Sequence, residues 1–162
     1  IGIVYKRQEL YRPNIYTFWK RTVPPPTMVT FDAASREYCV LQRSRTNTPL
    51  QALALLNEVA FVEAARNLAQ QMLQYKTDND ADRLRWGWRQ LTARYPNKYE
   101  LAVLEKMLAA SRTQYKTDIE SAKELIAFGE SVASTEFSSE ELAAFTIVAN
   151  LILNLDEVIN RE

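Results

Sequence analysis

The sequence predicts an all-α protein in which an irregular N-terminal arm packs on a multi-helix bundle of helical hairpins. Only three of the 162 residues are Gly, so few positions favour a flexible backbone over a helix. Capping residues precede several segments whose apolar residues recur three and four positions apart, which is the period of an amphipathic helix. Apolar residues make up 47% and charged residues 25% of the chain, the balance of an ordinary globular protein.

Residues 1–48 form the predicted arm, and residues 49–162 form the predicted helical body of the same domain. The arm has eight Lys or Arg and three acids, whereas the body has twelve Lys or Arg and seventeen acids. These formal charges of +5 and −5 favour a basic arm packed on an acidic body, although they are also typical of a surface for an anionic partner. The arm is rich in rings, so we expect it to be ordered and Trp19 to be buried. Pro24, Pro25 and Pro26 predict an extended polyproline spacer.

The first helix of the body is predicted to begin at Pro49. Thr48 precedes it as the N-cap and Gln51 stands three residues after Thr48, which is the capping-box arrangement. Asn57 marks a possible break, so residues 49–75 form one long helix or two short helices. After the break, the three-and-four spacing predicts a buried face made of Phe61, Ala64, Ala65, Leu68, Met72 and Leu73.

Two further helices are predicted between residues 80 and 117. We expect Asp80 or Asp82 to cap the first of them and Pro96 to end it. Its apolar stripe consists of Leu84, Trp88, Leu91 and Tyr95. Asn97 and Glu100 predict the cap of the second helix, whose stripe consists of Leu101, Leu104, Leu108 and Tyr115.

Two helices complete the predicted body. Asp118 opens one of them, which Gly129 is expected to end in the left-handed conformation. Ser138 and Glu141 form a further predicted capping box at the start of a strongly apolar helix. The most apolar stretch, residues 145–155, is shorter than the about 20 residues that a bilayer requires. We therefore expect a buried helix and no membrane span.

The residue types present exclude several classes of chemistry. The chain has one cysteine, Cys39, and no histidine. A covalent haem site needs Cys-x-x-Cys-His, classical zinc sites need several Cys or His, and serine or cysteine triads need a His base. We therefore expect no cofactor and no metal site in this chain. Cys39 itself is predicted to be a small buried apolar residue.

Two long strings in the first third of the chain resemble a known family. The strings are Phe-Trp-Lys-Arg-Thr-Val-Pro-Pro-Pro-Thr-Met from Phe18, and Arg-Thr-Asn-Thr-Pro-Leu-Gln-Ala-Leu from Arg45. Together with the closing residues 153–162, they resemble the planctomycete type of Domain of Unknown Function 1553. The resemblance implies the C-terminal portion of a large exported protein, periplasmic or at the cell surface, often with cytochrome c-like modules upstream. The chain begins without an initiator Met, and we expect it to be a piece of such a protein.

The arm holds the first candidate ligand-binding residues. Trp19, Lys20 and Arg21 place a ring beside two cations, a set that can stack on a sugar and attract an anion. The alternative is structural: the ring anchors the arm, and the cations complement the C-terminal end of a short helix.

Asp32 and Glu37 are the candidate acid and base pair. Paired carboxylates can cleave glycosides, one protonating the leaving group while the other attacks or activates water. The remaining candidates lie near them in sequence, and they are Arg36, Arg43, Arg45 and Asn47. The alternative is that Asp32 caps a short turn and Glu37 pairs with an arginine. On that interpretation, at least one of the three arginines pairs with an acid of the helical body.

Trp86 and Trp88 do not form a single aromatic platform. On a helix their side chains point about 200° apart, so at most one of them faces the core.

The sequence as a whole favours a non-catalytic helical scaffold or interaction domain, with upstream domains of the same protein as its partners. The alternative is a carbohydrate-binding or carbohydrate-active module with its site on the arm. A nucleic-acid partner is not expected, because the net charge is zero and the arm carries several acids.

Overall fold

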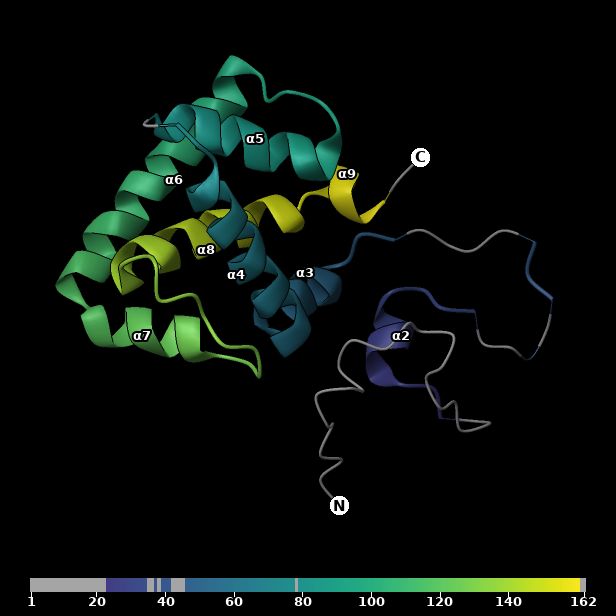
Figure 1. Ribbon diagram of the computed structural model, residues 1–162. Coiled ribbons are helices and arrows are strands. Elements are labelled where there is room, and N and C mark those ends of the chain that lie inside the picture. The colour runs from purple at the N-terminus through teal and green to yellow at the C-terminus, as the bar shows by residue number, and fades with distance from the viewer. Residues whose placement is uncertain (1–22, 35–36, 38, 42–45, 78, 161–162) are drawn as a thin grey trace. The chain divides into compact units, whose positions relative to one another are not determined.

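The computed structural model describes residues 23–34, 37, 39–41, 46–77 and 79–160 (Figure 1). These residues form eight helices and no strand, which confirms the predicted all-α class. The chain divides into two compact units, Ile1–Ala54 and Leu55–Glu162.

In the first unit, a short helix follows the proline run. Helix α2 spans Pro26–Thr30, and Pro25 is its N-cap with an extended backbone at φ −56° and ψ 133°. The predicted polyproline spacer is therefore wrong at Pro26, because a proline's fixed φ also suits the first turn of a helix. Cys39 is exposed, not buried as predicted. The described residues around it form no helix, and Leu41 is fully exposed. The described residues next to Cys39 therefore contribute no buried face.

Helix α3 (Pro49–Asn57) starts with the predicted capping box. The Thr48 amide donates to Gln51 Oε1 at 2.8 Å, and the Gln51 amide donates to Thr48 Oγ1 at 3.2 Å. The helix ends at the predicted break, Asn57, and Gln51 and Leu55 are its buried residues.

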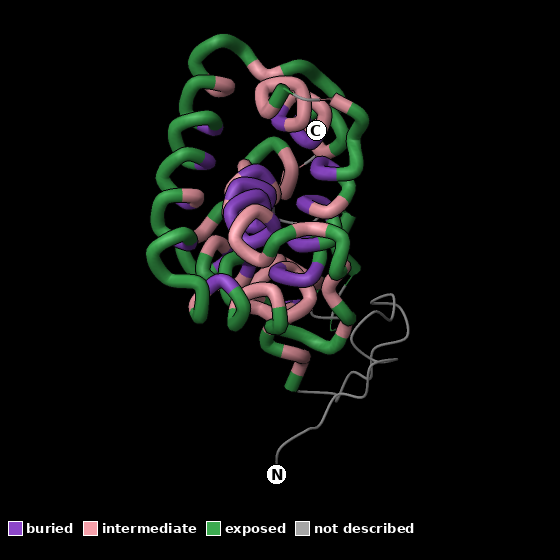
Figure 2. The backbone as a smooth tube through the Cα atoms, turned by 60° about the vertical axis from the view of Figure 1, so that its left-hand side comes forward, coloured by how far each residue is buried: buried purple, intermediate pink, exposed green. Residues whose placement is uncertain are grey.

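The core of the second unit is built around helix α8 (Ser139–Leu153). Helices α4 (Val59–Gln74), α6 (Lys98–Thr117) and α7 (Ile119–Ala127) pack against it. After Glu141 the helix carries no charged residue, and a helix that is apolar all round is stable only when it is enclosed. Figure 2 shows the buried residues gathered at the centre of this unit and the exposed residues on the outer faces.

The predicted buried faces are largely confirmed in these helices. Leu68, Met72 and Leu73 of α4 are buried, as are Leu104, Leu108 and Tyr115 of α6. Of the residues predicted for the buried face of α4, Ala64 is exposed and Phe61 is half-buried.

Three predicted caps of these helices are confirmed, at Asn97, Asp118 and Ser138. Helix α5 (Asp80–Thr92) differs: its N-cap is Asn79, whose side chain accepts from the Ala81 amide. Asp80 and Asp82 lie in its first turn instead, where an acid complements the helix dipole.

Helix α5 also ends earlier than predicted. Ala93 adopts the left-handed conformation at φ 60° and stops the helix before Pro96. As a result, Tyr95 leaves the predicted stripe and is 62% exposed. A proline disfavours the helical backbone conformation of the residue before it. Pro96 therefore opposes a continuation of the helix through Tyr95.

A short helix, α9 (Asp156–Ile159), follows α8 and contacts it and α5. Across the described ranges, no helix combines the length and the apolar content needed to cross a membrane.

Candidate functional site

Most of the candidate residues on the arm lie outside the described residues. These are Trp19, Lys20, Arg21, Arg36, Arg43 and Arg45. The expected burial of Trp19 and the expected arginine pairing therefore stay predictions. Of the other candidates, Glu37 and Asn47 are exposed and Asp32 is half-buried.

The Asp32 carboxylate is held by a neighbouring loop and by the start of α3. Its Oδ2 accepts from the Thr46 amide at 2.9 Å, from Thr46 Oγ1 at 2.6 Å and from Gln51 Nε2 at 3.4 Å. The Gln51 amide group also donates to the Thr30 carbonyl at 2.8 Å, which lies at the end of α2. Asp32 thus joins α2 to α3, and its carboxylate oxygen serves as a fixed acceptor.

In the second unit, Arg112 joins three helices. Its guanidinium donates to Asp80 Oδ2 of α5 at 2.5 Å, and its Nε donates to Glu141 Oε2 of α8 at 2.9 Å. The same group lies 5.6 Å from the ring centroid of Phe145. The hydrogen bond from Arg112 holds the pKa of Asp80 below its ordinary value, against the opposing effect of burial.

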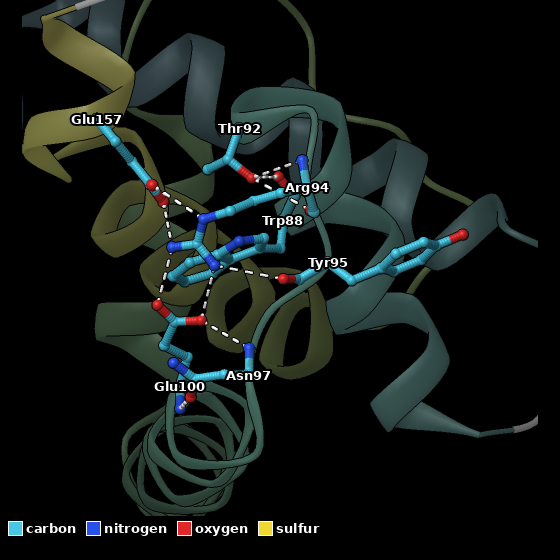
Figure 3. A network of polar contacts seen from close by, with 7 residues as sticks. All are labelled: Trp88, Thr92, Arg94, Tyr95, Asn97, Glu100 and Glu157. Carbon is cyan, nitrogen blue, oxygen red and sulfur yellow. Dashed lines mark hydrogen bonds and ion pairs between the residues drawn. The ribbon is translucent and has the colours of Figure 1, made fainter.

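Arg94 makes a similar junction near the other end of α5 (Figure 3). It forms paired hydrogen bonds to Glu100 at 2.8 and 2.9 Å and to Glu157 at 2.8 and 3.1 Å. Its guanidinium carbon lies 5.0 Å from the ring centroid of Trp88. The hydrogen bonds from Arg94, and then the one from the Asn97 amide, lower the pKa of Glu100.

A third arginine, Arg66 of α4, is fully buried. It donates to the Phe128 carbonyl at 3.1 Å, to the Ser131 carbonyl at 2.8 Å and to the Ile126 carbonyl. Glu63, also fully buried, pairs with Arg66 at 3.4 Å and accepts from the Ser131 amide at 2.5 Å. The pair therefore fastens the segment after α7 to α4.

An open pocket of about 280 Å³ lies where the end of α4 meets α5. It is lined by Tyr75, Lys76, Thr77, Asp82, Arg85, Trp86, Arg89 and Tyr95. The Tyr75 and Trp86 rings stack with their centroids 5.7 Å apart and their planes 23° apart. Trp88 is buried in the core, whereas Trp86 is half-buried, packs against the core and lines the pocket.

The pocket is positively charged. Among the described residues that line it, three side chains are cations and one is an acid, Asp82. Arg85 donates to Asp82 at 2.7 Å, and Arg89 donates to the Tyr95 hydroxyl at 2.6 Å while lying 4.8 Å from the centre of that ring. Sequence reasoning missed this site, because Tyr75 and Tyr95 approach Trp86 only through the turns on either side of α5. The triplet of Arg85, Trp86 and Arg89 on one helix was the only local signal.

Comparisons with known proteins give one result. The family model described as a protein of unknown function (DUF1553) matches residues 4–108, which include every residue lining the pocket. Searches of curated proteins and of solved structures found no match. Because the matched range covers more than half of the chain, this protein belongs to the DUF1553 family.

Proposed function

We propose that this chain is a non-catalytic helical scaffold or interaction domain. The observation that supports this proposal most directly is the way four acids of the second unit are engaged. Asp80 and Glu141 share Arg112, and Glu100 and Glu157 share Arg94. A general acid needs a raised pKa, whereas these contacts hold the pKa of Asp80 and Glu100 low.

The surroundings of Asp32 support the same proposal. Its carboxylate accepts hydrogen bonds from Thr46 and Gln51, which hold it in place beside the start of α3. The alternative function is a carbohydrate-active module in which Asp32 and Glu37 act as the carboxylate pair. The hydrogen bonds to Asp32 suit a structural role better than proton donation.

We also propose, from the family resemblance, that the chain is the C-terminal portion of an exported protein. Its partners would then be the upstream domains, including cytochrome c-like modules. The basic arm and the acidic body supply complementary charges for such contacts.

Two measurements test these proposals. The first assays the purified chain for release of reducing ends from a panel of polysaccharides, beside Asp32→Asn and Glu37→Gln. We expect no release, and activity that either substitution abolishes would overturn the non-catalytic assignment. The second measures binding in trans between this chain and the upstream part of its protein by isothermal titration calorimetry. Absence of binding at high micromolar concentrations would overturn the scaffold assignment.

A further inference from the structure

The pocket between α4 and α5 carries an inference that does not depend on the proposed scaffold role. We propose that it binds an acidic saccharide, that is, a sugar unit bearing a carboxylate. The site is built from Tyr75, Lys76 and Thr77 at the exit of α4, from α5, and from Tyr95 after α5.

The size of the pocket selects a small ligand. Its volume of about 280 Å³ lies at the lower end of the range for small-molecule sites. It therefore suits one or two sugar units of a chain rather than a folded partner.

The stacked pair of Tyr75 and Trp86 supplies an apolar surface. Their centroids are 5.7 Å apart, so no flat group can enter between the two rings. The ligand must instead lie against an outer face or edge of the pair. The C–H face of a pyranose ring packs on aromatic side chains in this way, since the ring faces carry negative charge and the C–H groups are weakly positive.

The charged groups account for the acidic character of the ligand. Lys76, Arg85 and Arg89 outnumber Asp82, so the pocket attracts an anion. Lys76 is exposed, and its ammonium has three donors for a carboxylate.

The hydroxyl groups of the sugar also find matching partners. Asp82 and Arg85 lie 2.7 Å apart, so an acceptor and a donor stand side by side, as the hydroxyls of a sugar require. Thr77 and the Tyr95 hydroxyl add groups that can both donate and accept. A simple acidic peptide can bind the cations. It does not use the neighbouring donors and acceptors or the surface of the aromatic rings.

The test titrates the full chain with tri-galacturonic acid by isothermal titration calorimetry, and repeats the titration with its methyl ester. We expect the ester to bind at least about tenfold more weakly, because it lacks the charges that form the strong hydrogen bonds. A hexaglutamate peptide carries more charge but no sugar ring. Equal affinity for hexaglutamate, or no binding of the trisaccharide at millimolar concentration, would overturn the proposal.

Two matched pairs of variants locate the site. Lys76→Gln should weaken binding about tenfold, while Lys106→Gln, on the exposed face of α6, should leave it unchanged. Tyr75→Ala should weaken binding to a similar degree, while Tyr99→Ala, at a ring that is 79% exposed, should not. Lys76, Lys106 and Tyr99 are exposed, so the melting temperatures of their variants should stay close to that of the parent. Tyr75→Ala also loses the stack on Trp86, so its binding is measured well below its own melting temperature. Equal losses within each pair would place the binding elsewhere and refute this site.

Discussion

Arg94 lies over the ring of Trp88, with its guanidinium carbon 5.0 Å from the ring centroid. The same guanidinium bonds Glu100 at the start of α6 and Glu157 in α9. One side chain thus connects the end of α5, the next helix and a helix more than fifty residues later. It covers the edge of the core where Trp88 would otherwise meet water.

We expect Arg94→Met to lower the free energy of unfolding by about 1–2 kcal/mol. The side chain is 44% exposed, so solvent screening reduces the contribution of each ion pair to below about 1 kcal/mol. Urea denaturation gives the value. The control is Arg85→Met, since Arg85 is equally exposed and has one ion pair with Asp82. If both variants lost the same stability, the junction formed by Arg94 would have no special role.

Acid should destabilise the second unit through Asp80 and Glu100. The pKa of each is lowered in the folded state, mainly by Arg112 and Arg94 respectively. The unfolded state therefore binds more protons, and stability rises with pH in this range. The stabilisation should be complete above the ordinary carboxyl pKa of about 4 and should fall as the pH drops through the lower folded values.

Denaturant midpoints between pH 2 and pH 6 measure this dependence. In Arg112→Met the slope with pH should be smaller, because Asp80 then keeps only Arg83 as a partner for its ionised form. An unchanged slope in this variant would contradict the assignment.

Arg66→Met should be strongly destabilising, by about 3–5 kcal/mol, because it breaks the buried ion pair between Arg66 and the Glu63 carboxylate. The double variant Glu63→Gln with Arg66→Met should recover part of the loss, since the buried charge is then removed. Thermal unfolding of the parent, of Arg66→Met, of Glu63→Gln and of the double variant measures the coupling between the two residues. Additive losses would show that the two residues act independently.

Gly129→Ala should lower stability by about 1–3 kcal/mol. Gly129 has φ 107°, and an added Cβ would collide with the Glu63 side chain. Ala93→Gly should act in the opposite direction, because Ala93 occupies the left-handed region at φ 60° and a glycine there avoids a cost of about 1–2 kcal/mol. Melting temperatures that moved in the same direction for both variants would contradict this explanation.

Local chemistry in the sequence predicted where several of the helices begin. The capping box of Asn97 and Glu100 depends on side chains within a few residues of the backbone groups that they satisfy. The same local reasoning failed at Asn79, because Asp80 and Asp82 nearby were equally suitable caps. Only the observed backbone distinguishes among them.

The pocket could not be predicted, for a different reason. Trp86 meets Tyr75 only because α4 and α5 pack against each other. The periodicity within one helix contains no information about the angle between two helices. The sequence also misled at Tyr95, where the spacing extended the stripe past the left-handed turn at Ala93. Cys39 was predicted to be buried for a similar reason. The apolar residues next to it in sequence do not show whether another part of the chain covers them.

The burial of α8 on all sides has a consequence for how the protein is made. Helices α4, α6 and α7 all rest on α8, yet α8 is synthesised after all of them. Until residues 139–153 have left the ribosome, the apolar faces of the three earlier helices have no common partner. The second unit should therefore acquire its cooperative structure late in translation, and its earlier helices should depend on chaperones in the meantime.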